Sequence, residues 1–124
     1  MEEDKLYDLI DLYRNPLHYG KPTHFNLEEE GYSPSCGDRF IVYLDVENEL
    51  IKDASFEGSG CVVSTVAASK LCSYIIGRGV KDVDDLGVED IKRLLGLTNI
   101  SAARVKCSLV GLNAVKSALH KSQD

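Results

Sequence analysis

Apolar and polar positions alternate over residues 39–46, and this period of two is typical of a β-strand with one buried face. The apolar positions are Phe40, Val42, Leu44 and Val46. Residues 47–49 read Glu-Asn-Glu and predict a turn, after which residues 50–56 form the returning strand. The pair predicts an antiparallel sheet with one covered face. A further short strand fits residues 25–30, within a mixed segment punctuated by glycine and proline.

Helical spacing of apolar residues marks most of the remaining chain. Near the N-terminus it involves Leu6, Leu9, Ile10 and Tyr13, and Asn15-Pro16 predicts the end of that helix. Further helices are predicted over residues 62–76, 88–95 and 105–119, the first two ending at Gly77 and Gly96. Strands followed by helices are typical of an α+β domain. We therefore expect a small antiparallel sheet of about three strands, packed against a layer of helices.

Length and charge narrow the classes of function. A chain of 124 residues with 44% hydrophobic content is long enough to bury a core, so we expect a single domain over residues 1–124. The net charge of −6 argues against binding nucleic acid through its phosphates. No apolar run reaches the roughly 18 residues of a membrane helix. The acidic start lacks the pattern of a signal peptide. These features predict a cytoplasmic protein with no membrane or nucleic-acid partner, whose cysteines stay reduced.

Three cysteines and an aspartate stand where predicted elements begin. Cys36 and Asp38 flank Gly37, where a loop enters the first strand, and Cys61 follows Gly58-Ser59-Gly60 at the start of a helix. Cys107 lies near the start of the last predicted helix. Three thiolates and a carboxylate can complete a four-ligand shell around zinc or an iron–sulfur unit. Taken singly, each cysteine is equally compatible with a small residue that fills a gap.

Two cations and the remaining cysteine and histidines complete the candidate chemistry. Arg104 and Lys106 stand beside Cys107, and positive neighbours favour its thiolate. Cys72 follows Cys61 by eleven residues on one helix, about 16 Å away, which is too far for a shared metal. We therefore expect Cys72 in the core. The three histidines have no ligand spacing and are expected on the surface or in loops; they are His18, His24 and His120.

Three ordered motifs carry a family resemblance. They are Ser33-Pro34-Ser35-Cys36-Gly37-Asp38, then Gly58-Ser59-Gly60-Cys61-Val62-Val63-Ser64 with Ala67-Ala68-Ser69, and finally Arg104-Val105-Lys106-Cys107-Ser108-Leu109. Together with Leu12-Tyr13-Arg14-Asn15-Pro16 they span most of residues 7–119. The chain resembles the iron–sulfur cluster assembly scaffold family, of the IscU/SufU/NifU N-terminal type, and the resemblance implies an IscU-like fold.

The resemblance implies a platform on which a [2Fe–2S] cluster is built from iron and sulfur. Cys36, Asp38, Cys61 and Cys107 would be the ligands, and any of the three cysteines could accept persulfide sulfur from a cysteine desulfurase. The cluster would pass to carrier proteins or apo target proteins. Thiolates suit soft iron and sulfide, whereas Asp38 offers a hard oxygen, so the bound cluster would be labile. Such a protein holds and releases its cargo and is not an enzyme with classical turnover; whether it forms a homo-oligomer stays open.

The sequence departs from the scaffold branch at two places. Lys106 stands where that branch usually has histidine, and residues 100–104 replace its Leu-Pro-Pro-Val-Lys chaperone-docking segment. Arg104 and Lys106 resemble the SufU branch instead, although that branch's usual insertion is missing. A zinc-dependent sulfurtransferase that uses the same residues is therefore the alternative. A purely structural zinc domain is less favoured, because such sites prefer shells of cysteine and histidine alone.

Overall fold

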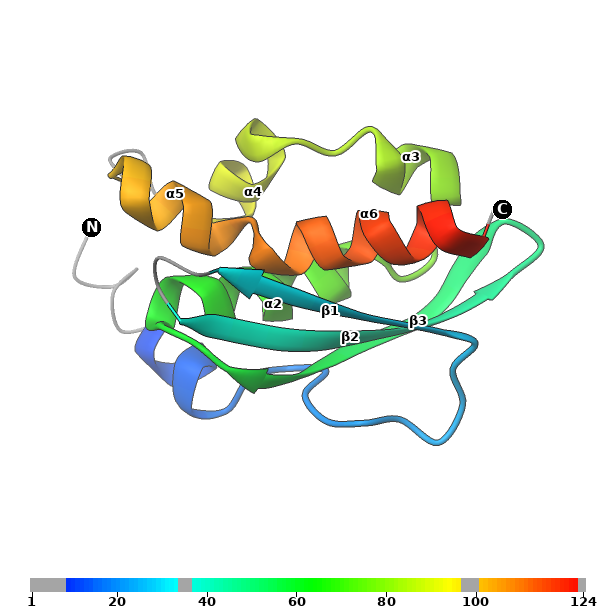
Figure 1. Ribbon diagram of the computed structural model, residues 1–124, viewed down its shortest axis with the longest axis horizontal. Coiled ribbons are helices and arrows are strands. Elements are labelled where there is room, and N and C mark those ends of the chain that lie inside the picture. The colour runs from blue at the N-terminus through cyan, green and yellow to red at the C-terminus, as the bar shows by residue number, and fades with distance from the viewer. Residues whose placement is uncertain (1–8, 34–36, 97–100, 123–124) are drawn as a thin grey trace.

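The computed structural model describes residues 9–33, 37–96 and 101–122. Three strands form one antiparallel sheet in the order β1-β2-β3, with β1 at Leu27–Ser33, β2 at Asp38–Glu47 and β3 at Leu50–Ser59 (Figure 1). The predicted hairpin is confirmed: Asn48 and Glu49 form its turn with positive φ angles of 54° and 63°. The alternating apolar positions of β2 are buried on the helical side, as Phe40, Val42 and Leu44 are each at most 1% exposed.

The short strand expected at residues 25–30 exists, but it begins at Leu27 and continues to Ser33. Its outer positions are acidic, at Glu28 and Glu30, and exposed. Charged side chains on an edge strand discourage pairing with a second chain. The prediction missed the end of this strand because pairing with β2 extends it: Gly31 pairs with Phe40 and Ser33 with Asp38.

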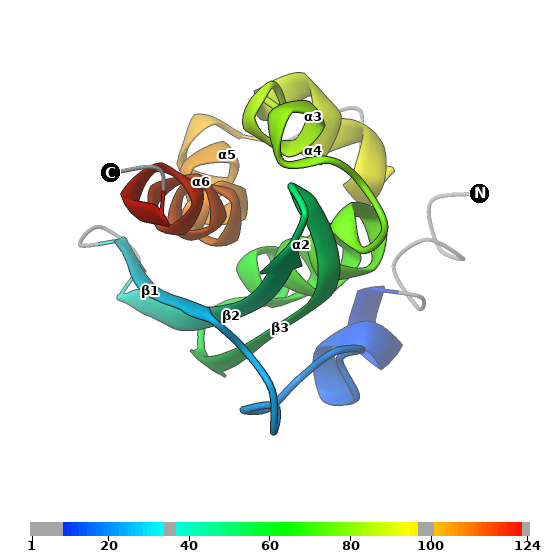
Figure 2. The ribbon, with the colours of Figure 1, turned by 90° about the vertical axis from the view of Figure 1, so that its right-hand side faces the viewer.

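Helices α2 to α6 cover one face of the sheet (Figures 1 and 2). Their bounds are α2 Val62–Ile75, α3 Val80–Asp84, α4 Val88–Leu95, α5 Ala102–Ser108 and α6 Val110–Ser122. Helix α2 packs against β3, α6 packs against β1 and β2, and both α4 and α5 pack on α2. Residues 9–14 are also helical and stop before Asn15-Pro16, as the sequence predicts. The result is the α+β arrangement that the sequence predicts.

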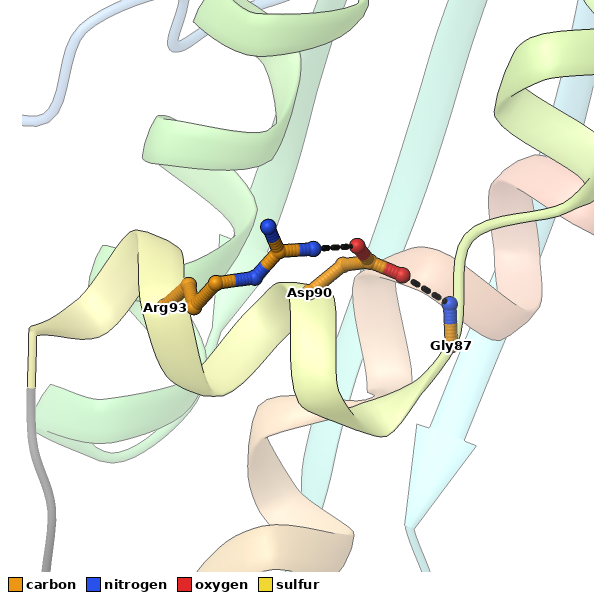
Figure 3. A network of polar contacts seen from close by, with 3 residues as sticks. All are labelled: Gly87, Asp90 and Arg93. Carbon is orange, nitrogen blue, oxygen red and sulfur yellow. Dashed lines mark hydrogen bonds and ion pairs between the residues drawn. The ribbon is translucent and has the colours of Figure 1, made fainter.

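Helix α2 and helix α4 end as the sequence predicts. Gly77 follows α2 with a φ of 88°, and Gly96 closes α4 with a φ of 72°, a conformation that favours glycine. At the other end of α4, Asp90 accepts a hydrogen bond of 2.8 Å from the backbone N–H of Gly87 and pairs with Arg93 (Figure 3). A carboxylate in the first turn also complements the helix dipole. This cap fixes the start of α4.

The last predicted helix, over residues 105–119, is wrong in its bounds and its continuity. The Ser101 side chain caps an earlier start by accepting a hydrogen bond of 3.3 Å from the Arg104 N–H. The helix then breaks at Leu109 into α5 and α6. The apolar period runs through the break, so the spacing gives no sign of it. Helix α3 was not predicted, because five residues are too few to show a helical period.

Within the described residues, no helix is both long and apolar enough to cross a lipid bilayer. Helix α6 approaches α2 closely at Gly111, where an added Cβ would lie 3.3 Å from the Ala68 Cβ of α2. Glycine on α6 and alanine on α2 are small enough to permit this approach. Helix α5, which precedes α6 in the chain, also packs against α2.

Candidate metal centre

Three of the four predicted ligands meet at one end of the molecule. Asp38 is the first residue of β2, Cys61 caps the N-terminus of α2, and Cys107 belongs to α5; these three elements come together at the left of Figure 1. One ligand atom from each residue lies within 4.8 Å of the others. Asp38 and Cys107 are 2% and 1% exposed, whereas Cys61 is half-buried. Residues far apart in sequence therefore place two sulfurs and a carboxylate together.

The two oxygens of the Asp38 carboxylate contact different groups of Cys61. Its Oδ1 accepts a hydrogen bond of 3.0 Å from the backbone N–H of Cys61. Its Oδ2 lies 3.8 Å from the Cys61 Sγ. One oxygen thus anchors the start of α2 to the start of β2, while the other faces the sulfur and remains available to a cation.

Cys61 is held by its own helix as well as by Asp38. Its side chain accepts a hydrogen bond of 3.4 Å from the backbone N–H of Ser64, which is the usual geometry of an N-cap. The sequence predicted that Cys61 begins a helix, and this is confirmed. Free N–H groups at a helix start favour a negatively charged sulfur, because the helix dipole is positive there.

Gly60 is required by the crowding beside Cys61. A Cβ at this position would lie 2.4 Å from the Ser64 Oγ, 2.8 Å from the Phe40 Cζ and 3.0 Å from the Asp38 Oδ1. Two of these contacts are shorter than real Cβ atoms show, so a side chain cannot be added without moving the site. The glycine before Cys61 is therefore part of the way that β2 and α2 approach each other.

Cys107 does not lie at a helix start, which corrects the prediction. It is the next-to-last residue of α5, because Ser101 starts that helix six residues earlier. Cys107 is buried, and α5, the helix that carries it, packs against α2. The structure holds Cys107 in a disulfide, whereas Cys61 and Cys72 are free thiols. Cys107 would therefore have to be reduced before its sulfur could bind a metal.

The other predicted site residues fall into three groups. Cys36 lies outside the described residues. Arg104 and Lys106 are exposed on α5, the helix that carries Cys107. Cys72 is 1% exposed, and burial together with the charge of Asp53 raises the pKa of its thiol to about 12. Cys72 is thus a core residue, as predicted.

The histidines are exposed, also as predicted. His18 and His24 lie in the segment before β1, and His120 lies on α6, where its Nε2 is 2.6 Å from the Asp84 Oδ1. Sequence reasoning missed Ser64, whose hydroxyl oxygen is 3.5 Å from the Cys61 Sγ. The signal was its position three residues after the cysteine, where an N-cap meets the first helical turn. Open space borders the site: a groove of about 330 Å³ runs along Tyr13, Tyr19, Gly60 and Thr65.

Comparison with known proteins assigns the chain to a family. The family model described as the NifU-like N-terminal domain matches residues 4–124. The chain belongs to this family.

Relatives within this family include both kinds of protein weighed above. The iron–sulfur cluster assembly scaffold protein IscU of Thermotoga maritima is 35% identical over 128 residues, covering 91% of this chain and 90% of that protein. The zinc-dependent sulfurtransferase SufU of Bacillus subtilis is 27% identical, covering 97% of this chain and 93% of that protein. The resemblance predicted from the three motifs is confirmed.

Solved structures agree on the fold. A protein of Fervidobacterium islandicum AW-1, described as a candidate iron–sulfur cluster assembly scaffold for the SUF system, has a TM-score of 0.72 at 25% identity, covering 90% of this chain and 93% of its own. The N-terminal part of a NifU-like protein from Brucella abortus has a TM-score of 0.76 at 16% identity, covering 99% and 98%. The predicted IscU-like α+β fold of this NifU-like domain is therefore confirmed.

Proposed function

We propose that this NifU-like domain is a scaffold on which a labile [2Fe–2S] cluster is assembled and from which it is released. The observation that carries the proposal is the convergence of Asp38, Cys61 and Cys107, whose ligand atoms lie within 4.8 Å of one another. Two sulfurs and one oxygen are donors that suit iron and zinc. Membership of the family, with its IscU relatives, supports the same function.

The fourth ligand in this proposal is Cys36. Only Gly37 separates it from Asp38 in sequence, so the two Cα atoms are at most about 7 Å apart along an extended chain. That distance is within reach of a metal shared by both side chains, since zinc–sulfur bonds measure about 2.3 Å. The proposed ligand set is Cys36, Asp38, Cys61 and Cys107.

Negative charge on the ligands favours the binding of a cation at the site. As anions, the Asp38 carboxylate and the two neighbouring sulfurs repel one another at these separations. A bound metal replaces that repulsion with attraction. Three thiolates and a carboxylate carry about −4 against the +2 of zinc, so Arg104 and Lys106 would offset part of the excess.

Sulfur would arrive by persulfide transfer from a cysteine desulfurase. A cysteine thiolate of this chain attacks the outer sulfur of the donor's persulfide, a new sulfur–sulfur bond forms, and the donor leaves as its own cysteine thiolate. Of the two described candidates, Cys61 is half-buried and Cys107 is 1% exposed, so access favours Cys61. The finished cluster would pass to carrier or apo target proteins. The chemistry needs thiols, and we propose the reducing cytoplasm as its compartment.

Anaerobic reconstitution tests this function. Wild-type protein, reduced beforehand, is incubated with ferrous iron, cysteine, a cysteine desulfurase and excess dithiothreitol, which supplies the electrons that reduce persulfide sulfur to sulfide. The scaffold predicts visible charge-transfer absorbance with iron and acid-labile sulfide in equal amounts. Cys61→Ser should lose the absorbance, whereas the matched control Cys72→Ala should keep it, because Cys72 lies in the core. A reduced wild-type chain that gains neither iron nor colour would contradict the proposal.

The second candidate is a zinc-dependent sulfurtransferase, and the Bacillus subtilis relative favours it. Four ligands from Cys36, Asp38, Cys61 and Cys107 would make a complete tetrahedral zinc site. The same purified protein distinguishes the two functions. One zinc per chain, no colour, and sulfur accepted from the desulfurase without iron would favour the sulfurtransferase.

A further inference from the structure

Ser64 contacts the Cys61 sulfur through two different groups. Its backbone N–H donates to the Sγ at 3.4 Å, and its hydroxyl oxygen lies 3.5 Å from the same sulfur. Ser64 is only 1% exposed, so water does not compete for these contacts. The backbone contact belongs to the helix cap and is independent of the side chain. The hydroxyl contact is specific to serine or threonine at this position.

The Ser64 hydroxyl can donate to either of two acceptors, the Cys61 sulfur or the Cys61 carbonyl oxygen. Besides the sulfur at 3.5 Å, the Ser64 Oγ lies 3.1 Å from the Cys61 carbonyl oxygen. That carbonyl already accepts a hydrogen bond of 3.0 Å from the Thr65 N–H. It therefore keeps a partner when the Ser64 hydrogen turns away, and the turn is a rotation about one bond that moves no heavy atom.

Metal binding decides between the two acceptors. A free Cys61 thiol can donate its own hydrogen to the Asp38 Oδ2 or the Ser64 Oγ. A sulfur that binds a metal has lost that hydrogen and can only accept. Against such a sulfur, a buried hydroxyl 3.5 Å away is favourable only when its hydrogen points at the sulfur. A hydrogen bond to a charged acceptor is also stronger than one to a neutral carbonyl.

We propose that Ser64 is a positioning residue for the cargo of this site: its hydroxyl donates a hydrogen bond to the Cys61 sulfur when that sulfur binds iron or zinc. The inference rests on the proposed function, because it needs Cys61 to be a ligand. This hydrogen bond would draw electron density from the Cys61 sulfur and fix the rotamer of the Cys61 side chain. Outer partners of this kind orient ligands and tune the metal.

Close packing around Gly60 supports a defined position for the Ser64 hydroxyl. An added Cβ at Gly60 would come within 2.4 Å of the Ser64 Oγ, so the glycine before the cysteine leaves the space that the hydroxyl uses. The same Cβ would lie 3.0 Å from the Asp38 Oδ1. The hydroxyl, the carboxylate and the sulfur therefore share one packed environment.

Cobalt(II) binding to the reduced protein tests the proposal, because the sulfur-to-cobalt charge-transfer band reports electron density on the sulfur. Ser64→Ala keeps the backbone N–H and removes only the hydroxyl. We expect its band to move to longer wavelength and its affinity for cobalt to fall about tenfold, as when other groups that hydrogen-bond a metal ligand are removed. Ser64→Thr keeps the hydroxyl and should restore both. On the reconstituted [2Fe–2S] protein, Ser64→Ala should lower the reduction potential, since hydrogen bonds to sulfur raise it.

The matched control is Ser69→Ala. Ser69 is also a buried serine of α2, at 0% exposure, but its hydroxyl bonds the backbone of Leu17, away from Cys61. Its band should match that of the wild type. Equal bands and affinities in wild type and Ser64→Ala would overturn the inference and leave the proposed function standing, as would equal shifts in both serine variants. A reduced wild-type chain that binds no cobalt would overturn the proposed function and the inference together.

Discussion

The backbone N–H of Cys61 donates a hydrogen bond of 3.0 Å to the Asp38 carboxylate, across 23 positions of sequence. This bond joins the first residue of β2 to the cap of α2 and leaves the second carboxylate oxygen facing the sulfur. Asp38 is thus both a proposed ligand and a structural anchor. Experiments on this residue have to separate the two roles.

Replacing Asp38 with alanine should slow cluster release. A hard oxygen is poorly matched to soft iron, so it offers incoming thiols an easy point of entry. The measurement is the decay of cluster absorbance after a chelator or apo acceptor protein is added. Asp38→Ala also leaves the Cys61 N–H without its partner, at a cost of about 1–3 kcal/mol if no water replaces it.

Asp38→Asn separates these effects, because its amide oxygen can still accept from the Cys61 N–H while the anionic ligand is gone. If ligand mismatch sets the release rate, both variants release more slowly than the wild type. Faster decay in both would count against the idea.

Lys106→Ala should retain the metal but accept sulfur more slowly. A protonated lysine has no lone pair to offer a metal, so it acts through its charge. Lys106 is exposed on α5, and we expect its loss to change the free energy of unfolding by no more than about 0.5 kcal/mol. The paired measurements are metal content per chain and the rate of persulfide transfer from the desulfurase.

The control for that experiment is Lys81→Ala, since Lys81 is an exposed lysine on α3, at the opposite end of the molecule from α5 (Figure 1). Its transfer rate should equal that of the wild type. Loss of metal in Lys106→Ala would mean that the proposed set of four ligands is incomplete.

Gly60→Ala should weaken metal binding and destabilise the fold. The added Cβ would meet Ser64, Phe40 and Asp38 at 3.0 Å or less, and overpacking of this kind costs about 1–3 kcal/mol. Thermal unfolding and cobalt titration measure the two effects. At Gly79 the same substitution meets nothing closer than 3.6 Å, so Gly79→Ala should keep wild-type cobalt affinity. If Gly60→Ala keeps the thermal stability and the cobalt affinity of the wild type, the prediction is wrong and the neighbouring side chains can move to accommodate the methyl group.

Tyr43 should make the fold sensitive to alkaline pH. It is 2% exposed and its hydroxyl donates to the Glu57 carboxylate; burial, and then Glu57, raise its pKa from 10.0 to about 12. Between these values the folded chain holds a proton that the unfolded chain releases. The contribution of protonated Tyr43 to the free energy of unfolding is therefore complete below pH 10 and is lost as the pH rises toward 12.

Denaturant unfolding at pH 9 and pH 11 measures this loss. Tyr43→Phe has no hydroxyl to ionise, so its free energy of unfolding should fall less over this interval than that of the wild type. Tyr32→Phe is the control, because Tyr32 is 54% exposed, and it should follow the wild type. Equal falls in wild type and Tyr43→Phe would refute the assignment.

The sequence alone determined the local elements where period and punctuation agree. The alternation through Phe40, Val42 and Leu44 predicted β2, and Gly77 and Gly96 marked the ends of two helices, because only glycine adopts such positive φ angles readily. It also separated Cys72 from the other cysteines, since helix geometry puts it three turns beyond Cys61. The motifs identified the family, which the match over residues 4–124 confirms.

Only the tertiary structure decided how these pieces meet. The break at Leu109, the start of α5 at Ser101 and the place of Cys107 near the end of that helix have no signature in the apolar period, because they depend on caps and packing. The same is true of the contacts that Ser64 and Asp38 make with Cys61. Spacing in a sequence fixes distance along one element. Strand pairing and helix packing bring atoms from different elements to within 4.8 Å, and this decides whether three separate side chains share a site.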